Sequence, residues 1–251
     1  MGINPKGFGI YLPLGYPSPE IFSKYIGSIS GLVDLIEIGI PTERPIYDGP
    51  VIRRAHREIM SRGYNRISIE SYQELLRVSC DKVALAYYSE ISGDLGGFLD
   101  KISGMGFRCL LAPDLLIEYP ERLGEYLRAS RDHGLDPCFF ISSKFPYSLV
   151  KRLPDYGAYL VYLGIQASTG TSLPIQVIRN ISIARDLIGN RSRLAVGFGI
   201  NSLERVLAVL RGGADIAIIG TEVIKRLAIG FEEALTFVRS ISEGLRGGAS
   251  G

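Results

Sequence analysis

Glu37 is a carboxylic acid inside a largely apolar run, and that placement is the strongest indication of chemistry in the chain. The run extends over residues 32–40 and reads LVDLIEIGI. Alternate side chains of a strand point to opposite faces, so the bulky even-numbered residues predict an outward face and place Glu37 on the inner one. Burial there would raise the pKa of the carboxyl group and suit it to exchange protons near neutral pH. The alternative is a structural glutamate satisfied by a hidden arginine or backbone donor.

Asp48 follows Glu37 by eleven positions, at the end of a loop stiffened by Pro41 and Pro45. The sequence Asp48-Gly49-Pro50 is typical of a helix N-cap followed by the first helical turn. Taken alone, Asp48 is therefore predicted to be a cap rather than a catalyst. The loop also allows its carboxylate to return toward Glu37, and the sequence leaves both interpretations open.

Three glycine-containing segments follow predicted strands late in the chain. Because glycine has no side chain, it lets backbone N–H groups approach an anion closely. N–H groups at helix starts after the last two strands of a barrel form a recurrent phosphate site. The segments are Gly197-Phe198-Gly199, Gly220-Thr221 and Thr169-Gly170. The first two predict phosphate binding, and the third is a candidate for closing the pocket.

The two histidines give no indication of a triad or a metal centre. His56 lies in the sequence RRAHR and is predicted to sit on a solvated basic helix face. Cys109 and Cys138 lie in apolar runs, so we predict buried thiols, which is typical of a reducing compartment. The cysteine spacing fits no zinc pattern, and we expect no metal site. Asp114 ends a predicted strand, where it suits a turn cap.

The elements that position these groups form a repeat of strand and helix. Eight β-branched or aromatic runs recur at a mean spacing of about 29 residues, and helical patterns lie between them. Near-continuous apolar runs are typical of strands buried on both faces of a parallel sheet. The pattern predicts a single (β/α)8 TIM barrel. The alternative is an open doubly wound sheet, although no G-x-G-x-x-G follows the first run. The runs span residues 7–12, 32–39, 82–88, 107–112, 136–142, 158–165, 193–199 and 215–220.

Composition restricts the class of protein. The chain has 251 residues and no dividing linker, so we predict one barrel domain over residues 1–245 and a disordered tail over 246–251. Its 28 basic and 26 acidic residues disfavour binding to nucleic acid or to an anionic membrane. We see neither a secretory signal nor an apolar stretch of spanning length, and we expect a cytoplasmic protein. Few asparagines and glutamines among many arginines favour a thermophilic source.

Taken in order, these residues resemble the alpha subunit of tryptophan synthase, over nearly the whole barrel. The most specific stretch is LIEIGIP followed by YDGPVIRRA, with the family's spacing between Glu37 and Asp48. Supporting stretches are LPLGYPS, ALAYY, ASTG, AVGFGIN and GADIAIIGTEVIK. The resemblance implies a carbon–carbon lyase that cleaves indole-3-glycerol phosphate, by a retro-aldol reaction, to indole and glyceraldehyde 3-phosphate.

The resemblance also assigns roles to residues. Glu37 would shuttle protons, and Asp48 would hold the indole N–H group. Two tyrosines, Tyr87 and Tyr162, would line the pocket, and Thr169 would support Asp48 when the sixth loop closes. The phosphate would lie on the backbone of Gly170, Gly199, Gly220 and Thr221.

A partner is implied as well. The family passes indole to a beta subunit that carries pyridoxal phosphate, in an expected α2β2 heterotetramer, whereas this chain is expected to hold no cofactor. The loops bearing Asp48 and Asp114 are candidates for the contact with that subunit.

The chain departs from the family pattern at several places. About seven residues precede the first predicted strand, so the family's N-terminal helix is expected to be missing. The loop before Asp48 reads TERPIY where the family has Phe-Ser-Asp-Pro-Leu-Ala, and Leu-Leu follows Asp114 where the family has Val-Pro. The segment between Tyr162 and Thr169 is one residue short, which leaves neighbouring positions open for the pocket tyrosine.

Three rival interpretations remain. Indole-3-glycerol phosphate synthase would want a catalytic lysine inside a strand, and none of the seven lysines is predicted to lie inside one, although Lys82 begins the run over 82–88. A phosphoribosyl isomerase would want paired aspartates at the ends of strands 1 and 5, where this chain reads LPLG and ISS. The third is a regulatory subunit that binds glycerol phosphates and activates a beta partner without useful catalysis.

Overall fold

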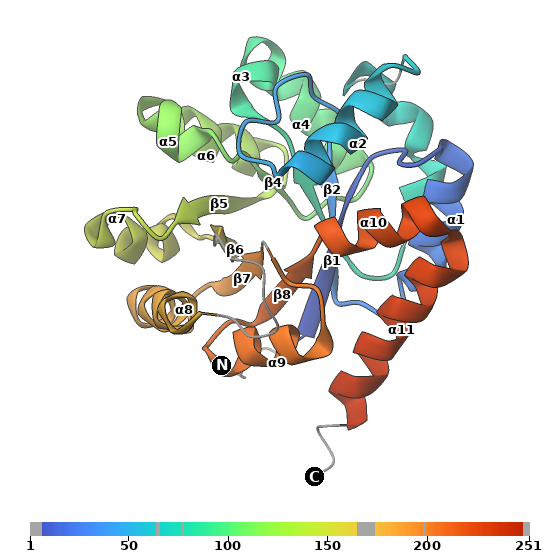
Figure 1. The fold of residues 1–251 in the computed structure, drawn as a ribbon. Coiled ribbons are helices and arrows are strands. Elements are labelled where there is room, and N and C mark those ends of the chain that lie inside the picture. The colour runs from blue at the N-terminus through green and yellow to red at the C-terminus, as the bar shows by residue number, and fades with distance from the viewer. Residues whose placement is uncertain (1–6, 64–65, 77, 165–173, 198, 248–251) are drawn as a thin grey trace.

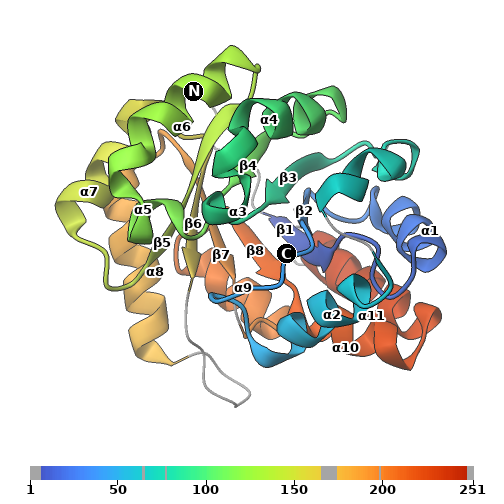
Figure 2. The same ribbon diagram turned by 90° about the horizontal axis from the view of Figure 1, so that it is seen from above.

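The chain folds into a closed barrel of eight parallel strands in chain order, which confirms the predicted (β/α)8 class (Figure 1). Strand β8 pairs with β1 and closes the ring. The computed structural model describes residues 7–63, 66–76, 78–164, 174–197 and 199–247. Seen from above, the helices surround the strands (Figure 2). Within the described residues, no helix has the length and apolar character needed to cross a membrane.

The strands coincide with the eight predicted runs but are mostly shorter. The third (Asp81–Leu85) begins one residue before its run and contains Lys82, so the prediction that no lysine lies inside a strand is wrong; Lys82 donates to the backbone carbonyls of Leu76 and Met105. The fourth is the shortest, with three residues. Their cores are buried, because helices cover the outside and side chains fill the inside. The strands are β1 (Gly7–Pro13), β2 (Leu35–Gly39), β3 (Asp81–Leu85), β4 (Cys109–Leu111), β5 (Asp136–Ser142), β6 (Leu160–Gly164), β7 (Arg193–Gly197) and β8 (Ile216–Ile219).

The helices lie between the strands and turn apolar stripes toward them. Two of them begin at a capping serine, because the side chains of Ser18 and Ser202 accept hydrogen bonds from the first turns of α1 and α9. The α-helices are α1 (Pro19–Ile29), α2 (Pro50–Met60), α3 (Tyr88–Ile91), α4 (Leu95–Gly104), α5 (Leu115–Glu118), α6 (Leu123–Asp132), α7 (Tyr147–Arg152), α8 (Ile175–Ile188), α9 (Leu203–Arg211), α10 (Thr221–Ile229) and α11 (Phe231–Gly247). The 3₁₀ helices are η1 (Arg66–Tyr72), η2 (Glu74–Leu76), η3 (Ser92–Asp94), η4 (Pro120–Arg122) and η5 (Leu153–Tyr156).

The two ends of the described chain lie side by side. Helices α10 and α11, red in Figure 1, pack beside α1 and α2, blue in the same view. Helix α11 continues to Gly247, so the first two residues of the predicted tail, Arg246 and Gly247, are helical instead. The rest of that tail, and the segment before β1 on which the expectation of a missing N-terminal helix depends, lie outside the described residues.

The cysteines correct one prediction. Cys109 and Cys138 are buried as predicted, but they form a disulfide rather than two free thiols. Cys109 pairs with Asp136 in the ladder between β4 and β5, and Cys138 lies two residues further along β5 on the same face. Adjacent strands therefore bring together two side chains 29 residues apart in sequence, and only Cys80 remains free.

Candidate active site

The side chains of greatest chemical interest converge on one pocket of about 540 Å³ at the carboxyl ends of the strands. Every strand or the loop after it contributes to the lining, as expected for the catalytic end of this fold. Its lining residues are Tyr11, Glu37, Tyr47, Asp48, Ile52, Leu85, Tyr87, Pro113, Phe140, Tyr162, Gly199, Ile200, Ile218, Gly220 and Thr221.

Glu37 lies inside the barrel, as the alternation along β2 predicted. Its side chain is 2% exposed, and neither carboxyl oxygen has a hydrogen-bond partner among the described residues. The alternative of a structural glutamate held by an arginine or a backbone donor therefore finds no support in this part of the chain. Burial, with a smaller effect from the negative charge of Asp48, raises the pKa of Glu37 to about 8.

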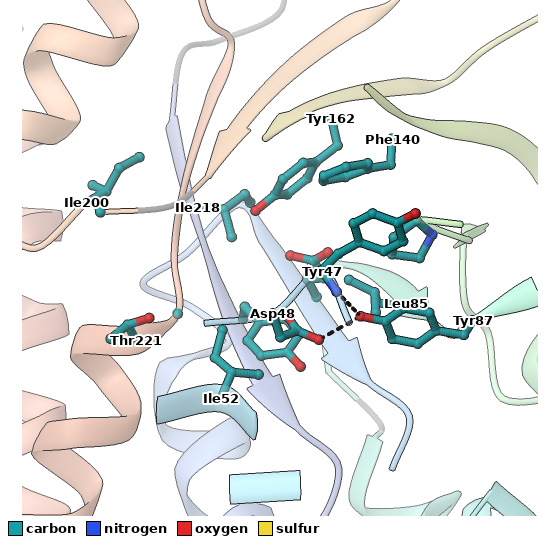
Figure 3. Close-up of a pocket in the computed structure, with 15 residues that line it drawn as sticks. Tyr47, Asp48, Ile52, Leu85, Tyr87, Phe140, Tyr162, Ile200, Ile218 and Thr221 are labelled. Carbon is teal, nitrogen blue, oxygen red and sulfur yellow. Dashed lines mark hydrogen bonds between the residues drawn. The ribbon is translucent and has the colours of Figure 1, made fainter. Parts of the chain in front are cut away.

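Asp48 lines the same pocket and does not cap α2. The N-cap position belongs to Gly49, and no side chain bonds to the first turn of that helix. Instead, the Tyr87 hydroxyl donates to Asp48 Oδ2 at 3.0 Å and accepts from the Tyr47 backbone N–H at 3.1 Å (Figure 3). Burial raises the pKa of Asp48 to about 6, although the Tyr87 hydrogen bond and the Arg53 charge both oppose the rise.

The C-terminal part of the loop that carries Asp48 is held by side-chain hydrogen bonds on two sides. Arg53 on α2 donates to the Asp48 carbonyl at 2.6 Å and to the Ile46 carbonyl at 3.2 Å. The Tyr47 hydroxyl donates to Glu118 on α5 at 2.7 Å. These bonds attach the loop to two neighbouring helices, so the Asp48 carboxylate is held over the pocket.

Aromatic rings form one wall of the pocket. Tyr47 stacks on Tyr87 at 6.2 Å between ring centroids, and Phe140 stacks on Tyr162 at 5.7 Å. Tyr47 also contacts Phe140, so the two stacked pairs join into one continuous wall (Figure 3). Such a wall presents flat apolar faces to a planar aromatic ligand.

Glycine makes room for two of the inward tyrosines. A Cβ at Gly197 on β7 would overlap the hydroxyl of Tyr162 on β6. A Cβ at Gly39 on β2 would overlap the hydroxyl of Tyr11 on β1. Each tyrosine therefore leans over a glycine of the next strand, and a larger residue there would displace its ring.

The opposite end of the pocket consists mainly of backbone. Gly199 follows β7 with a left-handed φ of +70°, which favours glycine, and Gly220 is the N-cap of α10. Thr221 is the first residue of α10, so N–H groups at the start of this helix lie at the pocket edge. A helix start of this kind suits an anion.

His56 corrects a second prediction. Its side chain is fully buried instead of solvated, and Nε2 lies 2.9 Å from the Tyr11 hydroxyl. Burial lowers the pKa of His56 to about 4, so the ring is neutral near pH 7. A signal was present in the sequence, because His56 continues the stripe of Ile52, Ala55 and Ile59 on α2.

The structure thus brings together seven of the nine predicted site residues. Thr169 and Gly170 lie outside the described residues. Asp114 is buried but does not cap its own turn, contrary to the prediction; its carboxylate accepts hydrogen bonds from the backbone N–H groups of Tyr88 and Ser89 at the start of α3. Tyr47 and Phe140 went unrecognised, because one lies in a loop and the other reads as an ordinary core residue.

No group of acidic, histidine or cysteine side chains suited to a metal occurs among the residues described.

Comparisons with known proteins agree with this architecture. The sequence model of the family described as tryptophan synthase alpha chain matches residues 3–244. The tryptophan synthase alpha chain of Sulfurisphaera tokodaii is 31% identical over 234 residues, which cover 92% of this chain and 94% of that one. The protein of the same name from Saccharolobus solfataricus is also 31% identical, with 92% and 93% covered.

The fold has a close counterpart among solved structures. A mutant tryptophan synthase alpha-subunit from the hyperthermophile Pyrococcus furiosus superposes with a TM-score of 0.86. The match covers 98% of this chain and all of that chain, at 25% sequence identity.

Proposed function

The chain belongs to the tryptophan synthase alpha chain family, and we therefore propose that it is a lyase that cleaves indole-3-glycerol phosphate to indole and glyceraldehyde 3-phosphate. One observation supports this proposal most strongly. Two buried carboxyl groups with different proton affinities line the same pocket, between an aromatic wall and a glycine-rich end. Carboxyl groups whose surroundings separate their pKa values are suited to different roles in acid–base chemistry.

Glu37 would act as the proton shuttle. With a pKa of about 8 it is mostly protonated at pH 7 and can deliver a proton to C3 of the indole ring. The resulting Glu37 carboxylate then takes the proton of the side-chain hydroxyl next to the ring. As that proton leaves, the bond between the ring and the glycerol carbon breaks, and its electron pair restores the indole. Glu37 ends protonated, and the products together contain all atoms of the substrate.

Asp48 would stabilise the positive charge that this protonation places on the ring. With a pKa of about 6 it is mostly ionised at pH 7, and its carboxylate can accept a hydrogen bond from the indole N–H. The Tyr87 hydroxyl holds one carboxylate oxygen, and among the described residues no side-chain donor is bonded to the other, which would accept from the ligand. Asp48 is thus a binding and electrostatic group, whereas Glu37 moves the proton.

The rest of the pocket matches the two ends of this substrate. The indole ring would lie against the wall that includes Tyr87 and Tyr162. The phosphate would lie on backbone N–H groups near Gly199, Gly220 and Thr221. Gly170 would add to this cradle and Thr169 would support Asp48, and for these two residues the proposal depends on the family resemblance.

We further propose that the indole passes to a tryptophan synthase beta subunit in an α2β2 assembly in the cytoplasm. The pyridoxal phosphate would be carried by that subunit, and this chain would need no cofactor of its own. The loop that bears Asp48 lines one side of the pocket through Tyr47 and Asp48 and includes the exposed Ile46. It is therefore the surface that we assign to the contact.

The direct test is release of indole from indole-3-glycerol phosphate, with and without a beta subunit. Glu37→Gln keeps the shape of the side chain and removes the proton shuttle, so we expect the rate to fall about 10²–10⁴-fold. Asp48→Asn loses a charge-assisted hydrogen bond, so we expect kcat/KM to fall about 10–100-fold.

Glu232→Gln is the matched control, because Glu232 is an exposed acid of α11, outside both the pocket lining and the loop assigned to the partner. This variant should keep the rate of the wild type. A wild type that releases no indole, alone or with the partner, would refute the lyase proposal. Full activity of Glu37→Gln would be compatible with the lyase proposal but would show that Glu37 is not the proton shuttle.

A further inference from the structure

Arg205 is a buried charge next to the glycine-rich end of the pocket. It lies in the first turn of α9, and its side chain is 2% exposed, whereas arginine is almost always largely exposed. Its guanidinium donates a hydrogen bond to the backbone carbonyl of Gly199. Gly199 and Ile200 line the pocket, and Arg205 is not among the lining residues. The guanidinium therefore contacts the pocket wall from behind.

The contact determines how one peptide unit is turned. The bond between Gly199 and Ile200 is trans, so its C=O and N–H groups point in opposite directions. Because Arg205 holds the carbonyl, the Ile200 N–H must point away from the guanidinium. The left-handed φ of Gly199 is what allows the chain to make this turn. The Ser202 side chain accepts a hydrogen bond from the Arg205 N–H, which keeps the residue at a fixed place in the helix.

We propose that Arg205 is a positioning residue for the phosphate group of the ligand. It holds the peptide after Gly199 with the Ile200 N–H facing the pocket, and it adds a fixed positive charge behind that peptide. This inference depends on the proposed function only for the place of the phosphate. It predicts selective recognition of the anionic end of the ligand, with no direct role in proton transfer.

The test compares two probes that occupy opposite ends of one pocket. Inorganic phosphate reports on the glycine-rich end and indole on the aromatic wall, and calorimetric titration of the full chain measures both affinities. For Arg205→Gln, we expect phosphate affinity to fall about tenfold, because a charged partner is lost. Indole affinity should stay within about twofold of the wild type, since a side chain behind the other wall does not touch that ligand.

A matched control comes from the same helix. Arg211 is an exposed arginine in the last turn of α9, so Arg211→Gln removes the same charge far from the pocket. This variant should bind both probes like the wild type. In cleavage assays Arg205→Gln should raise KM and leave kcat nearly unchanged, which is the signature of lost uniform binding.

If Arg205→Gln does not fold, Arg205→Lys tests the positioning role of Arg205 instead. Lysine keeps the charge but lacks the planar fork, so phosphate affinity should fall by about threefold, again with indole affinity unchanged. Equal phosphate affinity in wild type and variant, or a parallel loss of both probes, would overturn the role of Arg205. A wild type that binds both probes without cleaving indole-3-glycerol phosphate would instead count against the proposed reaction.

Discussion

Replacing Glu37 with glutamine should stabilise the folded chain increasingly as the pH rises, although it removes the proposed proton shuttle. The wild-type carboxyl group is buried and has no hydrogen-bond partner among the described residues, so its charged form is unfavourable in the folded state. Glutamine has the same shape as the protonated carboxyl group and stays neutral. The wild type and Glu37→Gln should therefore differ in stability only at pH values at which the Glu37 carboxyl group ionises.

The size of the effect follows from the pKa of Glu37. The folded state raises this pKa from 4.5 to about 8, so the folded chain binds the proton more tightly than the unfolded chain. The stabilisation that this tighter proton binding gives the folded state is fully present below pH 4.5 and is lost as the pH rises toward 8. Each pH unit between 4.5 and 8 lowers the free energy of unfolding by about 1.4 kcal/mol. The total loss at pH values above this window is therefore about 5 kcal/mol.

Urea unfolding at pH 5, 6, 7, 8 and 9 measures the difference between the two chains. We expect nearly equal free energies of unfolding at pH 5 and a gap of several kcal/mol in favour of Glu37→Gln at pH 9. Glu232→Gln, at an exposed position of α11, controls for the change in net charge and should follow the wild type. Parallel curves for wild type and Glu37→Gln across this range would refute the claim that Glu37 is a desolvated carboxyl group.

Three further predictions test other parts of the structure. Tyr87→Phe removes a hydrogen bond that lowers the pKa of Asp48, so the acid limb of the pH profile of kcat/KM should move upward, by up to about one pH unit; an unchanged limb would contradict this. Burial lowers the pKa of His56 from 6.5 to about 4, so the contribution of His56 alone to wild-type stability should fall by about 3 kcal/mol as the pH falls through this window, opposite in sign to the contribution of Glu37. His56→Gln should not show that loss in urea unfolding, and equal slopes would argue against burial of the ring. Alkylation of the denatured chain, followed by mass spectrometry, should modify Cys80 alone without reductant and all three cysteines with it; three modifications without reductant would show that no disulfide forms.

The spacing of apolar runs was enough to predict the fold, because a strand and a helix of the barrel each carry their own local pattern. Alternation along β2 likewise placed Glu37 on the inner face without any knowledge of its neighbours. The glycines after β7 and β8 could be located in the same way, because a helix start after a strand is a local feature.

The role of Asp48 could not be settled locally. The sequence Asp48-Gly49-Pro50 is compatible with a cap, and only the position of Tyr87, from the loop after β3, shows where the carboxylate is held. His56 shows a similar limit in a different form. Its place on the apolar stripe of α2 was readable, but the Tyr11 hydroxyl that it contacts comes from a strand 45 residues away.

The sequence by itself thus determined the barrel, the inward carboxyl group of Glu37 and the strand ends at which polar groups collect, because these depend on periodicities of two and 3.6 residues. The tertiary structure decided which groups meet. The curvature of the barrel brings Tyr47 of one loop against Phe140 of β5, and the pairing of β4 with β5 joins Cys109 to Cys138. It also decided the proton affinities of Glu37 and Asp48, because desolvation depends on every neighbour that excludes water and no local pattern records those neighbours.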